Sequence, residues 1–281
     1  FTTKLIINEV TTMTLEELKL CKEGLTHSGT FHADDVFSAA FLKLIVPDIT
    51  IHRVSEVPED FHGIVFDIGM GEFDHHMSDN EKRKNGIPYA SFGKLWRAFA
   101  SELYGEYVMQ KIDKSFIEGL DLSDNTGKYD SLCSAIAALN PIDRDASGDD
   151  DFFEAVEFAQ KILDQKIKKE LRNFQEGQEV LEIYQAMEDK RIVILPRYLS
   201  FHDVLPRTEA IYVVFPSKRG GYSAQGVTKN VDTIELKKDF PKEWVEKLPD
   251  YLRFCHTSRF LISADSLENV IRACKEALES E

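Results

Sequence analysis

Cysteine is scarce in this chain, and the few cysteines that it has lie far apart. The 281 residues include four, with no CxxC pair among them: Cys21, Cys133, Cys255 and Cys274. This spacing excludes the disulfide framework of small secreted proteins and the paired thiolates of a zinc ribbon. We therefore expect a protein of a reducing compartment, with a cytoplasmic location.

Long hydrophobic runs are also lacking. The longest apolar stretch, Val36–Val46, is interrupted by Ser38 and Lys43 and falls well short of the roughly 20 residues that a membrane span requires. Near the N-terminus, the apolar run Leu5–Ile7 is too short for the apolar region of a secretory signal. We expect a soluble protein with no membrane partner, and we assign no function to the residues before Met13.

Positive charge is in short supply. The chain has 34 Lys and Arg against 49 Asp and Glu, a formal net charge of -15. Because phosphate binding is driven mainly by Lys and Arg, this balance argues against a broad basic surface for nucleic acid. Local basic clusters remain candidates at residues 82–84 and 166–172, although charge runs on helices are more often solvated faces. Divalent cations bound at an acidic site would cancel part of the negative charge.

What is present is the pattern of an α/β protein. The length and the 43% hydrophobic content allow two domains of ordinary size. In the first half, strand-like runs alternate with helical runs, which predicts a parallel sheet covered by helices. We expect strands ending at Thr26 and covering 49–54 and 63–67, helices at 34–46 and 91–104, and a further helix with the apolar stripe Val108, Ile112, Phe116 and Leu120.

An acid-rich segment, residues 143–157, separates the two halves. It has seven acids against one base, which is the composition of a linker. We therefore predict a parallel-sheet domain with helices on both faces at residues 1–147, followed by a smaller α+β domain at 148–281. In the second domain we expect a long or broken helix at 152–188, strands at 191–195, 210–215 and 222–228, a hairpin turn at 217–221 and a final helix at 266–278 capped by Ser266.

Histidines and aspartates gather in the first 125 residues, mostly in turns after strand-like runs. His27 follows one predicted strand and Asp67 follows another, and ligands of open α/β sheets bind beyond the carboxyl ends of the strands. The adjacent Asp74, His75 and His76 would be costly to bury unless they were paired or coordinated. A single histidine is more often a satisfied structural residue, and an aspartate at a strand end can simply cap a helix. The grouping, rather than any one residue, predicts a site.

Imidazoles mixed with carboxylates favour transition metals such as manganese, iron or zinc, whereas magnesium and calcium prefer oxygen ligands. Six candidate donors can hold two ions only if one carboxylate bridges them, and Asp67 at a strand end is the natural bridge. Two ions about 4 Å apart can activate water and stabilise the leaving oxygen of a phosphoester. We therefore predict phosphoryl hydrolysis with one or two divalent cations, preferably Mn²⁺.

These residues also resemble a known pattern. The stretches Thr26–Asp35, Asp67–Gly69 and Phe73–His76 are similar to motifs of the melanocyte-proliferating-gene family, a group of DHH-related phosphoesterases often labelled metal-dependent protein hydrolases. The similarity extends to Phe240–Trp244 and Phe254–Phe260, and so covers most of the chain. Eukaryotic members are described as RNA exonucleases, and the wider superfamily includes manganese-dependent pyrophosphatases. The resemblance implies a DHH-type catalytic domain acting on RNA or oligonucleotides.

Position by position, the resemblance assigns roles within the site. The first motif implies His27, His32 and Asp34 as ligands, the second implies Asp67 as the bridging ligand, and the third implies His75. Leu122–Asn125 resembles the fourth motif, which makes Asp124 the last ligand and Asp121 its local competitor. The catalytic residues are then Asp67, Asp74 as the group that orients His75, and His76 as a phosphate-contacting or acid/base residue.

The late segment departs from the family pattern, because Ser258 and Arg259 occupy a stretch that is usually small and glycine-containing. We expect His256 and Arg259 to bind substrate, facing the metal cluster across an interdomain cleft, since Arg offers a planar fork suited to phosphate. The alternative is that His256 satisfies a strand end and Arg259 is a surface charge.

Three functions therefore stay open. The favoured one is a phosphodiesterase or exonuclease that hydrolyses RNA or short oligonucleotides with a two-metal centre. A small-molecule phosphoesterase or pyrophosphatase would suit the acidic surface better. A non-catalytic regulatory protein could keep the fold, although all six ligand positions carry competent donors. The sequence also leaves open whether the protein is a homodimer.

Overall fold

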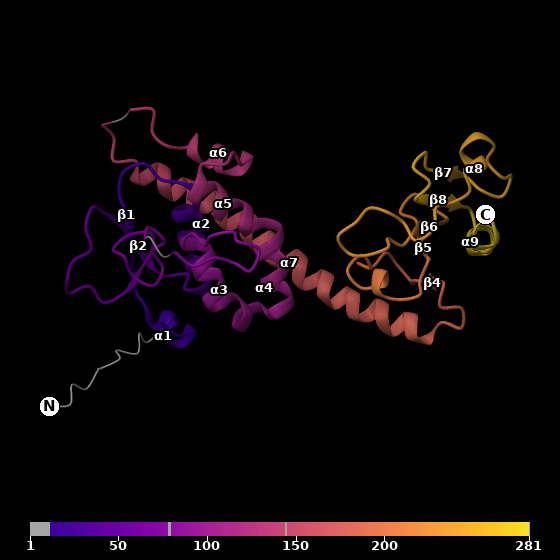
Figure 1. Ribbon diagram of the computed structural model, residues 1–281, viewed down its shortest axis with the longest axis horizontal. Coiled ribbons are helices and arrows are strands. Elements are labelled where there is room, and N and C mark those ends of the chain that lie inside the picture. The colour runs from indigo at the N-terminus through magenta and orange to yellow at the C-terminus, as the bar shows by residue number, and fades with distance from the viewer. Residues whose placement is uncertain (1–11, 78–79, 144, 281) are drawn as a thin grey trace. The chain divides into compact units, whose positions relative to one another are not determined.

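The computed structural model describes residues 12–77, 80–143 and 145–280. It divides into two compact units, Phe1–Leu171 and Arg172–Glu281 (Figure 1). The run Leu5–Ile7 lies outside the described residues. Within the described part of the chain, no helix is long and apolar enough to span a membrane.

The first unit is built on a three-stranded parallel sheet. Its strands are β1 (Glu23–His27), β2 (Thr50–Val54) and β3 (Ile64–Val65), in the order β2-β1-β3. Gly24 allows the close approach of the strands, because a Cβ at this position would come within 2.8 Å of Ile51 Cδ1. The carboxyl ends of parallel strands meet at one edge of a sheet. His27, the last residue of β1, and Asp67, shortly after β3, therefore start from the same edge.

The helices of this unit are α1 (Leu15–Leu20), α2 (Ala33–Ile45), α3 (Ser91–Tyr104), α4 (Glu106–Ile112), the π-helical turn η1 (Asp113–Ile117), α5 (Glu118–Thr126) and α6 (Ser131–Ala137). Helix α2 is buried at every position from Ala33 to Leu42. From Val36 onward these positions are apolar except for Ser38, as expected of a helix enclosed by the core. The Phe41 ring lies 5.0 Å from the Trp96 ring of α3 between centroids, which holds the two helices together. The α/β class predicted from the sequence is confirmed.

Helix α7 (Asp149–Ala186) crosses the division between the units. Its first half, including Phe152, Val156 and Leu163, packs into the core of the first unit. The first compact unit therefore ends at Leu171 rather than at residue 147, where the acidic composition suggested a boundary. Part of that acidic segment is the first turn of α7, Asp149–Asp151, where carboxylates stabilise the helix by interacting with its dipole.

The second unit contains a five-stranded mixed sheet in the order β4-β5-β6-β8-β7. β4 and β5 are parallel and the other neighbours are antiparallel. The predicted hairpin turn at 217–221 connects β5 to β6, and Ser266 caps α9 by accepting from Asn269 N at 3.2 Å. The elements are β4 (Ile192–Ile194), η2 (Leu205–Arg207), β5 (Tyr212–Pro216), β6 (Tyr222–Gly226), α8 (Glu243–Glu246), β7 (Phe254–Cys255), β8 (Leu261–Ala264) and α9 (Leu267–Glu279).

Candidate metal centre

The loop from His27 to His32 is held in place by two residues that are distant in sequence. The guanidinium of Arg53 donates to Gly29 O, and its Nη1 pairs with Asp149 Oδ1 at 2.8 Å. The side chain of Asn140 grips the backbone of Phe31, accepting from its N at 3.0 Å and donating to its O at 2.9 Å. Gly29 has a φ of +85°, a conformation that glycine adopts without strain. The loop thus leaves β1 and enters α2 along a fixed path.

Two adjacent carboxylates occupy the first turn of α2. Asp34 accepts from Ser91 N at 2.9 Å and from Phe92 N at 2.7 Å, and so binds the free amides at the start of α3. Asp35 Oδ1 accepts from His32 N at 2.8 Å. The other oxygen, Asp35 Oδ2, is buried without a hydrogen-bond partner and lies 3.3 Å from His27 Nε2. A buried carboxylate oxygen without a donor is suited to a cation.

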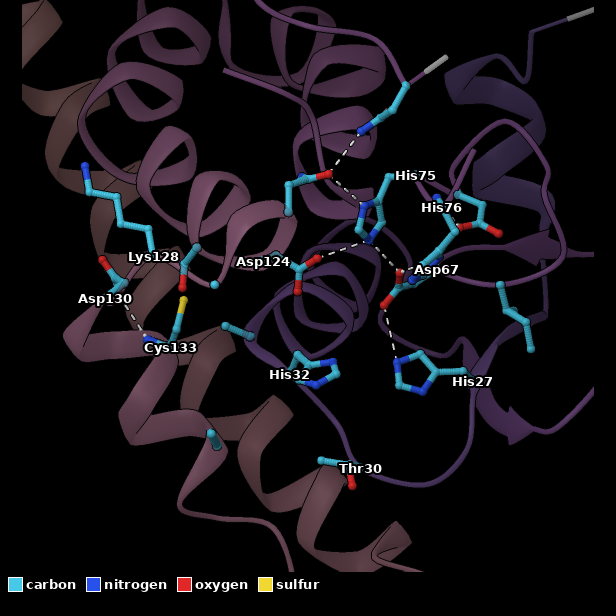
Figure 2. Close-up of a pocket in the computed structure, with 18 of the residues that line it drawn as sticks. His27, Thr30, His32, Asp67, His75, His76, Asp124, Lys128, Asp130 and Cys133 are labelled. Carbon is cyan, nitrogen blue, oxygen red and sulfur yellow. Dashed lines mark hydrogen bonds and ion pairs between the residues drawn. The ribbon is translucent and has the colours of Figure 1, made fainter. Parts of the chain in front are cut away.

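Asp67 lies at the centre of the cluster (Figure 2). Its Oδ2 is 3.3 Å from His27 Nε2, and its Oδ1 is 3.1 Å from His75 Nε2. Ser91 Oγ donates to the same Oδ1 at 3.3 Å. Asp67 has a φ of +56°, in the left-handed region that aspartate adopts more readily than most non-glycine residues. Each carboxylate oxygen of Asp67 thus faces a different histidine, as a bridging ligand would require.

His75 connects Asp67 to the end of α5. Its Nε2 lies 3.1 Å from Asp124 Oδ2 and 3.7 Å from Asp34 Oδ2, and its Nδ1 is 3.2 Å from Asn125 Oδ1. Asp121, the local competitor of Asp124, is fully buried and its Oδ2 lies 2.8 Å from Arg83 Nη2. Asp124 therefore belongs to the cluster through its contact with His75, whereas Asp121 pairs with Arg83.

Asp74 contacts the histidine that follows His75. Its Oδ1 lies 2.6 Å from His76 Nδ1, and its Oδ2 accepts from Met70 N at 2.7 Å. The sequence suggested Asp74 as the group that orients His75, but in the structure Asn125 takes that place. The difference arises because both carboxylate oxygens of Asp74 have other partners, Met70 N at one and His76 at the other. His76 is exposed, with its Nε2 left for other partners.

Burial and neighbouring charges shift the pKa values of the cluster in opposite directions. Burial raises the pKa of Asp35 to about 7 and holds the pKa of Asp34 well above its usual range. Burial opposes the ionisation of Asp67 too, but hydrogen bonds from His27 and His75 hold its pKa well below its usual range. Burial likewise disfavours charge on the imidazoles, yet the carboxylates around them raise the pKa of His27 to about 9 and that of His75 to about 11. Without a metal, two imidazolium groups supply the positive charge that the buried acids require.

Three overlapping groups of side chains bring their donor atoms close enough to hold a metal ion. They share Asp67 and His75 between them, and combine the imidazoles and carboxylates that transition metals accept. The groups are His27, Asp35 and Asp67; Asp67, His75 and His76; and Asp34, His75 and Asp124. Five of the six ligands predicted from the sequence belong to them. Asp35 and His76 join in addition, and the sequence had assigned no metal contact to either.

His32 lines the same cavity without joining any of these groups. Its side chain is exposed, and its ring centroid lies 6.0 Å from that of His27 (Figure 2). The cavity has a volume of about 1080 Å³ and extends from Asp67 and His76 to the loop between α5 and α6, where Lys128 and Tyr129 line it. This cavity leaves room for a substrate beside the cluster.

The two candidate substrate-binding residues of the second unit lie close together at the end of β7. Arg259 has a φ of +55°, and its Nη2 pairs with Asp239 Oδ2 at 2.5 Å. His256 accepts from Ser258 N at 3.0 Å through Nδ1. Both side chains therefore have partners within their own unit, and their role toward substrate stays a prediction.

Of the two basic clusters, the one at 82–84 is interrupted, because Arg83 is buried and pairs with Asp113 and Asp121. In the other, Lys168 pairs with Asp164, and Arg172 lies 3.9 Å from Glu176. In the part of the chain that the structure describes, neither cluster lines the cavity beside Asp67 and His76. The homodimer that the sequence left open gains no support from the described residues.

Comparison with known proteins places this arrangement in a family. The family model MYG1_exonuc, described as "Uncharacterised protein family (UPF0160)", matches residues 24–278. The chain is 22% identical to a MYG1 protein of Saccharomyces cerevisiae, with 92% of this chain and 96% of that protein covered. It is 26% identical to the MYG1 protein of Chlamydia muridarum, with 90% and 94% covered, and 23% identical to that of Dictyostelium discoideum, with 85% and 87% covered. No solved structure matches the chain.

The match to the family model begins in β1 and ends in α9. It therefore includes the three donor groups of the first unit, which we call the metal-site cluster, and the mixed sheet of the second unit. The chain belongs to the MYG1 family.

Proposed function

We propose that the chain is a phosphoesterase of the DHH type that hydrolyses RNA or short oligonucleotides at a two-metal centre, with Mn²⁺ as the preferred ion. The observation that carries the proposal is the position of Asp67, whose two carboxylate oxygens face His27 and His75 in separate donor groups. The name of the matching family model, which refers to an exonuclease, supports the class of reaction.

The donor set fits divalent metals by its chemistry. Asp35 Oδ2 is a buried acceptor without a hydrogen-bond partner, and the imidazoles and carboxylates around it are the ligands that manganese, iron and zinc accept. In this proposal His27, Asp35 and Asp67 would hold one ion, and Asp34, Asp67, His75 and Asp124 the other. Bound divalent cations would polarise the phosphoryl group and make water more acidic.

The chain's own groups would then position and protonate the substrate. Asp74 pairs with His76 Nδ1 at 2.6 Å, which fixes the imidazole and leaves Nε2 to exchange a proton with an oxygen of the substrate. Lys94 donates to Asp74 O at 2.5 Å and so holds the loop that carries both residues. His76 is exposed at the cavity, where a leaving oxygen could reach it.

The proposal is tested by metal analysis followed by turnover. Purified protein should contain a divalent transition metal, and it should hydrolyse a labelled oligoribonucleotide with added Mn²⁺ and stop when the metal is chelated. His52 is exposed on β2 and pairs with Glu23, so His52→Ala is a matched control that should keep full activity. Asp67→Asn should lose it.

Two outcomes would replace the proposal. Hydrolysis of pyrophosphate but not of oligonucleotides would identify a small-molecule phosphoesterase. Metal-loaded protein without phosphoester hydrolysis would point to the non-catalytic alternative.

A further inference from the structure

The loop between α5 and α6 presents two residues to the cavity of the metal centre. Asp124 lies in the last turn of α5, and Gly127 ends that helix with a φ of +68°. Asp130 then caps α6 by accepting from Leu132 N at 2.8 Å and from Cys133 N at 3.0 Å. Both ends of the loop are therefore anchored, and the two residues between them, Lys128 and Tyr129, line the cavity.

The side chains of Lys128 and Tyr129 are available for a ligand. Tyr129 is 79% exposed, and Lys128 is exposed as well. Among the residues that the structure describes, neither side chain has a hydrogen bond, ion pair or ring contact with another. A single exposed tyrosine is ordinary, but this one stands beside a lysine on the wall of a cavity that also contains the metal-site cluster.

Lys128 is a basic residue in a cavity that is lined mainly by acidic and neutral side chains. Its lining includes the carboxylates of Asp67, Asp74, Asp124 and Asp130, and Lys128 is the one Lys or Arg among the described residues that line it. Figure 2 shows Lys128 on the far side of Asp124 from Asp67 and His27, with its ammonium group directed away from Asp124. A ligand that contacted both the metal-site cluster and Lys128 would need two anionic groups at separate positions.

We propose that Lys128 and Tyr129 form a subsite for a second nucleotide of the substrate, next to the scissile phosphodiester. This inference rests on the proposed function and deepens it. The ammonium of Lys128 binds the neighbouring phosphate as a flexible point charge. The ring of Tyr129 stacks on the base, a contact worth about 1–3 kcal/mol and tolerant of base identity. Oligonucleotides are thereby preferred over pyrophosphate and small esters, which lack a second nucleotide.

Binding can be measured separately from turnover. The probe is a fluorescent tetraribonucleotide with phosphorothioate linkages, titrated with Mn²⁺-loaded protein and followed by fluorescence anisotropy. Tyr129→Ala and Lys128→Ala should each weaken binding about fivefold or more, and Tyr129→Phe, which keeps the ring, should bind within about twofold of the unchanged protein. Lys128→Ala should also reduce the slope of log affinity against log salt by about 0.7, as the loss of one phosphate contact to a single strand requires.

Lys22→Ala serves as the control, because Lys22 is an exposed lysine just before β1, at the opposite end of that strand from His27. It should change neither the affinity nor the salt slope. Steady-state kinetics then supply the second readout. The ratio of kcat/KM for the unmodified tetranucleotide to that for methyl p-nitrophenyl phosphate should fall about fivefold or more in Tyr129→Ala, with the metal content unchanged.

Unchanged affinity and salt slope in both alanine variants would overturn the subsite, and so would an equal loss of kcat/KM on both substrates. Failure of the unchanged protein to bind the probe would overturn it as well. If the probe binds through Lys128 and Tyr129 but neither substrate is hydrolysed, the subsite stands and the proposed hydrolytic function fails.

Discussion

Asp34 joins the metal site to the folding of α3, and this predicts an unusual stability effect. Its two carboxylate oxygens accept from Ser91 N and Phe92 N, both in fully buried residues. The N-cap residue of α3 is Ala90, which has no side-chain acceptor. Asp34 therefore supplies the cap from another helix, and Asp34→Ala leaves two buried amides without a partner.

The size of the effect follows from these two bonds. A buried donor left unsatisfied costs about 1–3 kcal/mol, and removal of a helix cap about 0.5–2 kcal/mol. The substitution also removes a buried carboxylate whose ionisation is opposed by burial and by Asp67, which offsets part of the loss. We expect Asp34→Ala to lower the free energy of unfolding of the metal-free protein by about 2–4 kcal/mol. Asp34→Asn keeps one acceptor and should lose about half as much.

The assay is urea unfolding after removal of metal, because bound metal would stabilise the folded state by itself. Trp96 lies in α3, whereas the chain's other tryptophan, Trp244, lies in the second unit. Fluorescence measured in a Trp244→Phe background therefore reports on α3. Asp124 is partly exposed and pairs with His75 rather than with backbone amides, so Asp124→Ala leaves no buried amide without a partner and should cost less stability than Asp34→Ala. Equal stability of the Asp34→Ala and Asp124→Ala proteins would refute the reasoning.

Four further predictions concern the metal ligands, the loop that carries His27 and the candidate substrate contacts. Asp67→Ala should abolish hydrolysis and release metal while the circular dichroism spectrum stays that of the folded protein, and wild-type turnover would rule out the bridging role. Because the pKa of His27 is raised to about 9 and a metal binds only the neutral imidazole, metal binding should release protons and tighten as the pH rises from 6 toward 9; calorimetry in buffers of different ionisation enthalpy measures this, and a pH-independent Kd contradicts it. Asn140→Ala frees the backbone of Phe31 and should lower kcat and metal affinity several-fold, whereas equal metal affinity would show that Asn140 does not position the loop. Arg259→Ala should raise KM or lower kcat for an oligonucleotide without changing metal content, and unchanged kinetics would confine the substrate contacts to the first unit.

The sequence predicts the parts of this structure that follow from local patterns. Helix α3 begins at Ser91 and ends before Gly105, as its periodicity and its glycine indicate. His27 and Asp67 come together because parallel strands end at one edge, a rule that needs no knowledge of side-chain packing. The fold class and the region of the site could therefore be predicted.

The remaining features depend on contacts between distant residues. Asp35 was not assigned a ligand role, although an aspartate three residues after a helix cap commonly binds the cap amide and here leaves its second oxygen toward His27. The pairing of Asp74 with His76 depends on the turn at Met70. Composition also could not show that the acids at 149–151 begin α7, because a linker and a helix N-terminus both favour them.

Asp34 both belongs to a candidate metal-binding group and caps α3. These two roles affect how the sequences of related proteins can diverge. A lineage that abandoned hydrolysis would be released from keeping His27 or Asp124, since neither holds the start of a helix. A change of Asp34 in that lineage would still remove the hydrogen bonds that cap α3, and with them part of the protein's stability. The retention of this aspartate in a relative is therefore weak evidence for activity, and the loss of His27 or Asp124 is the informative change. Relatives that serve only as binding proteins should therefore keep Asp34 but lack His27 or Asp124.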